Sequence, residues 1–88
     1  MKSDVFTAWI TRYALSAGIR KIQARETEHP GMIEEVGGNN IMPYYHGEGN
    51  DWHRTPEAAL KRAEAMRDAK IKSHQASISK LQKLKFNA

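Results

Sequence analysis

Histidine and carboxylate side chains gather in the middle of the chain, where they could bind a metal ion. His46 and His53 flank Glu48 and Asp51, and imidazole and carboxylate groups are both zinc ligands. Zinc sites, however, use three or four ligands at closer and more regular spacings, and the glycine and asparagine residues between these side chains would make a flexible cage. We therefore expect no metal ion and no cofactor.

Candidate nucleophiles and acid–base pairs are present without the neighbours that catalysis requires. Three serines fall in one predicted helix, Ser73, Ser77 and Ser79. They lack the strained turn and the oxyanion loop that activate a serine. The Gly37-Gly38 pair is not followed by the Lys-Ser/Thr of a phosphate-binding loop. Glu34 and Glu35 are adjacent in a predicted strand, so their side chains point to opposite faces. The sequence predicts no catalytic residues, and we interpret the chain as non-enzymatic.

The stretch from residue 55 to residue 86 is predicted to be one long amphipathic helix. Thr55 can cap the first turn, Pro56 suits the first helical position, and Glu57 faces the positive end of the helix dipole. Neither Gly nor Pro occurs beyond Pro56. At about 100° per residue the apolar side chains form one stripe. The stripe comprises Ala59, Leu60, Ala63, Met66, Ile71, His74, Ile78, Leu81 and Leu84.

Half of this helix is expected to extend beyond the sheet, because a small sheet covers only about 20–25 Å of it. Ile71, His74, Ile78 and Leu81 step by three, four and three residues, like the seam of a short coiled coil. We predict that they pair with a second copy in a homodimer or dock on another protein. In one alternative, residues 29–51 fold back over the stripe. A line of small residues, Ala58, Ala65, Ala69 and Ala76, could also let a partner helix approach closely, but alanine is the best helix former, and we prefer that interpretation.

Residues 5–45 are predicted to form an antiparallel sheet of three or four strands. Alternating β-branched and aromatic residues, separated by Gly, Pro and Asn, place the strands at residues 5–15, 19–27, 32–36 and 41–45. Pro43 cannot donate to a ladder, so the last strand is expected to lie on an edge or to be irregular. In the connecting loop over residues 46–54, Trp52 is expected to fill the joint where the sheet meets the helix, with its ring buried and its N–H donated to a loop carbonyl. The predicted fold class is α+β, within a single domain of 88 residues.

Charge is distributed unevenly along the chain. Residues 1–53 carry five Lys/Arg against seven Asp/Glu, a net charge of −2, whereas residues 54–88 carry nine against three, a net charge of +6. Cysteine is absent, no apolar run approaches the roughly 18 residues of a membrane span, and we recognise no secretory signal. We expect a soluble intracellular protein without a membrane partner.

A nucleic-acid-binding accessory protein is the alternative function that the sequence leaves open. Aromatic residues on the predicted strands could stack with bases, namely Trp9, Tyr13, Tyr44 and Tyr45. Cations that could form a basic rim are Arg12, Arg20, Lys21 and Arg25, and the basic helix could add to them. Against this alternative, the later strands and the loop carry Glu34, Glu35, Glu48 and Asp51, and no nucleic-acid motif is present.

Two stretches of the chain carry a resemblance to a known group of proteins. They are residues 13–19, Tyr-Ala-Leu-Ser-Ala-Gly-Ile, and residues 45–55, which run from Tyr45 to Thr55 and into Glu57-Ala58-Ala59. They resemble small uncharacterised proteins encoded by bacteriophages and prophages of proteobacteria. The resemblance implies no catalytic residues. It implies a protein of the bacterial cytoplasm that binds a host protein, including host defence machinery such as CRISPR effectors.

The sequence therefore predicts a non-catalytic interaction module that binds and modulates or inhibits a host protein. The positive net charge of +4 argues against an acidic mimic of nucleic acid. The residues expected to contact the partner are Tyr44, Tyr45, His46, Lys80, Lys83 and Lys85. Self-association is expected through Ile71, His74, Ile78 and Leu81.

Overall fold

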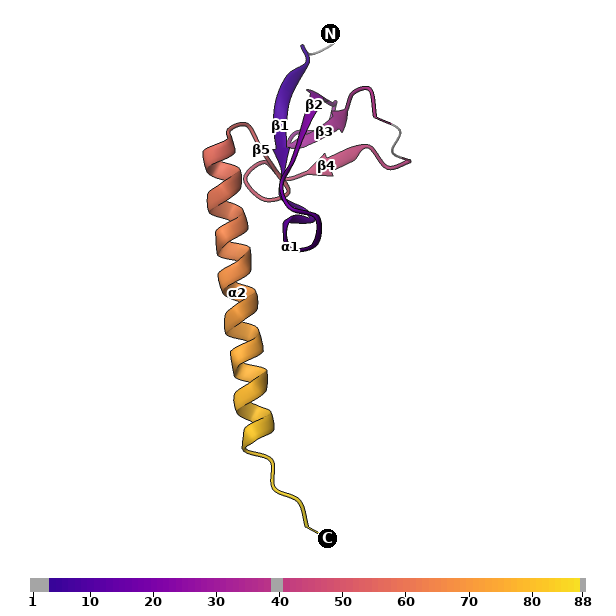
Figure 1. Cartoon of the computed structure of the whole chain (residues 1–88). Helices are drawn as coiled ribbons and strands as arrows, with labels where there is room; N and C mark the ends of the chain where they lie inside the picture. The colour runs from indigo at the N-terminus through magenta and orange to yellow at the C-terminus, as the bar shows by residue number, and fades with distance from the viewer. Residues whose placement is uncertain (1–3, 39–40, 88) are drawn as a thin grey trace.

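The fold is α+β, as predicted: a curled antiparallel sheet is followed by one long helix (Figure 1). The structure is a computed structural model that describes residues 4–38 and 41–87. Its elements in these ranges are β1 (Phe6–Ile10), α1 (Ala14–Ala17), β2 (Arg20–Glu26), β3 (Met32–Glu35), β4 (Tyr44–His46), β5 (Trp52–His53) and α2 (Pro56–Gln82). The five strands found there lie in the order β4-β3-β2-β1-β5.

The core lies on the inner face of the curled sheet. Phe6, Ala8 and Ile10 share this face of β1, as the alternation predicts, and Ala8 lies opposite Ile22 of β2. The buried cluster consists of Ala8, Ile10, Ile22, Ala24, Ile33, Tyr45 and Trp52. Tyr45 and Trp52 come from strands at opposite edges of the sheet, so the sheet must curl to bring both into one core.

Trp52 is the largest of the fully buried side chains, and its expected burial and its expected hydrogen bond to a loop carbonyl are confirmed. Its ring is 1% exposed, and its Nε1–H donates to the carbonyl of Gly31 in the β2–β3 turn at 2.9 Å. The guanidinium of Arg54 lies over this ring, 5.1 Å from its centre, and over Phe6 at 4.6 Å. Arg54 therefore covers the apolar core while its charge stays at the surface.

Several elements of the sheet region differ from the prediction, and the fourth strand covers Tyr44–His46 instead of residues 41–45. The first strand ends at Ile10, not at residue 15, because the N–H of Thr11 donates to the carbonyl of Asp51 at 2.9 Å and the chain then turns into α1. Gly18, with a φ of 81°, ends α1. The predicted loop over residues 46–54 contains β5, which pairs with β1 and adds a strand at that edge.

Helix α2 starts as predicted and ends earlier. The hydroxyl of Thr55 accepts the N–H of Ala58 at 3.2 Å, and Pro56 occupies the first turn. The helix ends at Gln82, four residues before the predicted end. No helix in residues 4–38 and 41–87 is long and apolar enough to cross a membrane.

Only the first half of α2 packs against the sheet region. Ala59 is fully buried, and Arg62, Ala63 and Met66 are half-buried, whereas every residue from 67 to 87 is exposed. The molecule measures 69 × 27 × 21 Å, with a radius of gyration of 18.1 Å. A compact chain of this length would have a radius of gyration near 12 Å. The distal half of α2 thus extends away from the sheet (Figure 1).

Candidate functional site

The residues considered for metal binding do not assemble into a site. His46 is exposed on β4, whereas His53 is 2% exposed on β5. Glu48 accepts a hydrogen bond from Arg54 at 2.9 Å. Among residues 4–38 and 41–87, no group of three His, Cys, Asp or Glu side chains is placed to hold a metal ion.

His53 belongs to a buried polar network that joins the β4–β5 loop to α2. The hydroxyl of Thr11 donates to the carbonyl of Asn50 at 2.8 Å. Because the hydroxyl hydrogen is used in that bond, the Nε2–H of His53 donates to the hydroxyl oxygen of Thr11 at 2.9 Å. The pKa of His53 is lowered below its ordinary value of 6.5, mainly by burial and next by the positive charge of Arg62. The carbonyl of Asn50 and the negative charge of Glu48 raise this pKa, but by less. The buried, neutral imidazole thus ties β5 to Thr11 after β1 and, through Thr11, to Asn50 of the β4–β5 loop.

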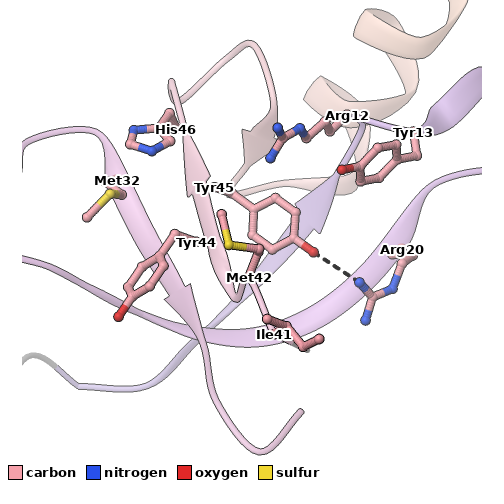
Figure 2. Close-up of a pocket in the computed structure, with 9 residues that line it drawn as sticks. All are labelled: Arg12, Tyr13, Arg20, Met32, Ile41, Met42, Tyr44, Tyr45 and His46. Carbon is pink, nitrogen blue, oxygen red and sulfur yellow. Dashed lines mark hydrogen bonds between the residues drawn. The ribbon is translucent and has the colours of Figure 1, made fainter. Parts of the chain in front are cut away.

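A cleft of about 510 Å³ opens beside β4 and is the first candidate functional site (Figure 2). Strand β4 supplies one wall, and the segment after β1 and the start of β2 supply the other. The lining residues are Arg12, Tyr13, Arg20, Met32, Ile41, Met42, Tyr44, Tyr45 and His46. The volume is within the range of roughly 300–1,000 Å³ that is usual for ligand pockets.

The charged side chains that line the cleft are basic. Arg20 donates to the hydroxyl of Tyr45 at 3.1 Å and to Glu35 at 3.1 Å, and half of its side chain stays accessible. Arg12 lies over the Tyr13 ring, 5.4 Å from its centre, and forms no ion pair with any residue in the described ranges. Because none of the lining residues is acidic, the cleft suits a negatively charged group.

The rim of the cleft is apolar and open to solvent. Ile41 is 95% exposed and Met42 is 76% exposed. Tyr13 and Tyr44 present about half of their surface. Tyr, Met and Arg are enriched where proteins bind one another, so the composition of the rim and walls is that of a protein-binding surface.

Three of the predicted contact residues line this cleft, and three lie far from it. Tyr44, Tyr45 and His46 are there, although the Tyr45 ring is 4% exposed and belongs to the core. Lys80, Lys83 and Lys85 lie at or beyond the far end of α2 (Figure 1). The nucleic-acid alternative grouped Arg12 and Arg20 with these tyrosines as a basic rim, and the cleft does bring them together, whereas Lys21 and Arg25 do not line it.

The aromatic platform considered for nucleic acid is divided between two faces. Trp9 lies on the outer face with the Lys21 ammonium 6.0 Å from its ring centre, whereas Tyr45 points into the core. On the outer face, Arg25 is 3.6 Å from Glu34. Glu34 also lies opposite Tyr44 in the pairing of β3 with β4. On that face an acid therefore separates Arg25 from Tyr44, whereas Arg12 and Arg20 meet tyrosines in a cleft without an acidic residue in its described lining.

The distal half of α2 is the second candidate surface. Ile71 is 47% exposed, Ile78 53% and Leu81 65%, and His74 is exposed beside them. The alternative in which residues 29–51 fold back over this stripe is wrong for the described residues, since all of residues 67–87 are exposed. The stripe is left without a partner from the described part of its own chain.

Comparisons of the chain with protein-family models, with curated proteins and with solved structures found no match. The resemblance to phage-encoded proteins accordingly stays a prediction.

Proposed function

We propose that this chain is a non-catalytic protein-binding module that forms a homodimer through the distal half of α2. The observation that carries the proposal is the exposed apolar stripe. Ile71, Ile78 and Leu81 lie on one side of a helix segment whose residues are all exposed from Arg67 onward. Burial of apolar surface is the main driving force for protein association.

The charge pattern supports an antiparallel arrangement of the two helices. Residues 67–87 carry six Lys/Arg against one Asp, whereas residues 1–53 have a net charge of −2. A parallel pair would bring the two basic ends together. An antiparallel pair over residues 67–82, about 24 Å long, directs each basic end towards the acidic sheet region of the partner, and opposite charges favour that orientation.

The test is the mass of the protein in solution, measured by light scattering. The wild-type chain should have twice its monomer mass of 10.0 kDa. Ile78→Asp combined with Leu81→Asp should give the monomer, because an unpaired carboxylate in an apolar seam weakens association roughly a hundredfold or more.

The matched control places the same two charges on the opposite side of α2. Ala69→Asp combined with Ala76→Asp should leave the dimer intact, since these residues lie about 180° and 160° around the helix from Ile78. A monomeric wild-type chain contradicts the proposal. The proposal is also contradicted if the Ala69/Ala76 substitutions disrupt the dimer and the Ile78/Leu81 substitutions do not. That result would assign the interface to the small residues.

The dimer would act by binding a further protein, and the sequence resemblance suggests a host protein of a bacterium as the target. The basic far half of α2 also favours one other function, nucleic-acid binding. The two are distinguished by salt, because binding to phosphates falls steeply as salt is added. Affinity for labelled single or double strands at low salt, lost in Lys80→Glu/Lys83→Glu/Lys85→Glu, would support that alternative.

A further inference from the structure

We propose that the cleft beside β4 binds an extended acidic segment of a partner protein, which adds as a strand to the free edge of β4. This inference rests on the proposed function in one respect, namely that the chain acts by binding another protein. It concerns a different surface from the dimer helix, and it specifies the chemistry of the partner.

The backbone of β4 has an edge that can accept another strand. Strand β4 ends the sheet order. Every second residue along this part of the chain directs its backbone hydrogen bonds towards β3. The carbonyl of Pro43 accepts the N–H of Glu35 at 2.8 Å, and the N–H of Gly47 donates to the carbonyl of Gly31 at 2.9 Å. Between these two bonds, Tyr45 lies opposite Ile33. The intervening residues of the strand therefore direct their N–H and C=O groups away from β3. Such an edge is a template for an added peptide strand.

The cleft along this edge has the size and the charge to select an acidic strand. Strand β4 is three residues long, or about 10 Å, and about 510 Å³ lies beside it. Arg12 and Arg20 line the wall opposite β4, and no described lining residue is a carboxylate; Arg20 is paired with Glu35 at 3.1 Å behind the wall, so Arg12 carries the charge left unpaired in the described ranges. A guanidinium can hold a carboxylate through two parallel hydrogen bonds. Arg12 has its donors available, because its one interaction in the described ranges is with the face of the Tyr13 ring.

Apolar side chains of the added strand also have a place to pack. Met42 and Ile41 are largely exposed at the rim, and Tyr44 faces outward beside them (Figure 2). Exposed apolar side chains next to an open strand edge are a liability in a protein that works alone. Here they would contact the apolar residues of a strand that alternates apolar and acidic side chains.

The surroundings of the cleft favour a peptide over a nucleic acid. Past Tyr44 the surface continues into a second hollow, whose lining includes Glu26, Glu28 and Glu34. A nucleic acid carries a negative charge at every nucleotide, so a strand crossing both hollows would meet these acids. A peptide can be acidic only where it meets the arginines, and its backbone can pair with β4 whereas a phosphate backbone cannot.

The probe is a fluorescein-labelled peptide of about eight residues, long enough to span the edge of β4, in which valine and glutamate alternate. Its fluorescence anisotropy is titrated with the monomeric Ile78→Asp/Leu81→Asp protein and with the wild-type chain. Binding by both proteins is expected. Loss of the dimer and loss of peptide binding are then separate results, so either proposal can fail without the other.

The variants test the two features that define the site. Arg12→Ala should weaken binding of the glutamate peptide roughly tenfold or more, since a charged hydrogen-bond pair is lost, while the matched Arg25→Ala, outside the cleft, should not. A peptide with lysine in place of glutamate should not bind. A glutamate peptide whose backbone is N-methylated at alternate residues, so that it cannot pair with an edge, should bind at least tenfold more weakly.

Four outcomes would overturn the inference. They are no binding of the glutamate peptide, equal binding by Arg12→Ala, equal binding of the N-methylated peptide, and displacement of the peptide by an oligothymidine strand. In the supporting case, the amide signals of Tyr44 and His46 shift in the NMR spectrum when the peptide is added, and circular dichroism shows that Arg12→Ala is folded.

Discussion

At the scale of single residues, a small polar network under α2 fixes the β4–β5 loop in place. Thr11 and His53 are almost completely buried, and both bond within that network. Arg62 of α2 donates to the side chain of Asn50 at 2.7 Å, which ties the loop to the helix. Buried polar groups are costly unless they are paired, so the network makes this one arrangement of loop, strand and helix preferable to others.

The network predicts that the folded protein becomes less stable in mild acid. The pKa of His53 is lowered in the folded state by burial and by Arg62. In the unfolded chain the same imidazole takes up a proton near its ordinary pKa of 6.5. The unfolded state therefore binds more protons below that pH, and the free energy of unfolding must fall as the pH decreases from 6.5 towards the lowered pKa.

The measurement is the urea midpoint at a series of pH values between about 7.5 and 5.5. His53→Gln should remove that part of the fall, whereas the matched His29→Gln, at an exposed residue, should keep it. A midpoint that decreases equally in the wild-type chain and His53→Gln would contradict the assignment.

Residue types alone could not assign the tyrosines of β4 to their faces. Period-two alternation states that neighbouring residues point to opposite faces, and Tyr44 and Tyr45 do so. Which of them is buried depends on the pairing of Ile33 with Tyr45, a contact between separate strands that the spacing of one strand does not contain.

At the scale of elements, α2 starts where the first turn has every local signal. Thr55 caps the N–H of Ala58, and Ala59 packs against the sheet one residue later. The turn that is capped is thus also the turn that carries the fully buried contact of α2. The stability of the helix start and the stability of the whole fold should therefore be coupled.

Thr55→Ala should lower the free energy of unfolding by about 1 kcal/mol, because an N-terminal cap is lost. Thr55→Ser retains a hydroxyl that can accept from Ala58 and should cost only a fraction of that. Both values come from urea unfolding followed by the fluorescence of the buried Trp52. A loss in Thr55→Ser as large as in Thr55→Ala would show that the methyl group, not the cap, is responsible.

Local signals predicted the long elements and missed the short ones. The helix start was readable because Thr, Pro and Glu each have a stated role in a first turn. Strand β5 has two residues, too few for an alternation, and it forms because the chain returns alongside β1. The four residues of α1 likewise depend on Thr11, whose N–H bonds to Asp51 from a distant part of the chain.

At the scale of the whole molecule, the residues that stabilise the fold and the residues that extend the molecule lie in different parts of the chain. The buried residues of the described chain end at Ala59, so the sheet and the first turns of α2 contain the core. The stretch beyond them contributes length and charge. The overhang could be predicted because the helix is longer than a small sheet can cover, whereas the cleft could not, because it depends on the curl.

Removal of residues 71–88 should therefore leave the core intact. Compared with the monomeric Ile78→Asp/Leu81→Asp chain, the shortened chain should have the same free energy of unfolding within about 0.5 kcal/mol, since the side chains of residues 71–87 are exposed. Urea unfolding measures this, and circular dichroism should show less helix. A large loss of stability would mean that the distal half of α2 folds onto the sheet in solution.

Helix α2 runs from Pro56 to Gln82 without a glycine or a second proline to bend it, and this continuity has a geometric consequence. Two copies joined antiparallel along their far halves would hold a cleft at each end of a stiff strut. The distance between the two clefts would then be set by the number of helical turns that separate them. A target that displays two suitable strands at that spacing would be held with avidity well above the affinity of one cleft, and a target with another spacing would not.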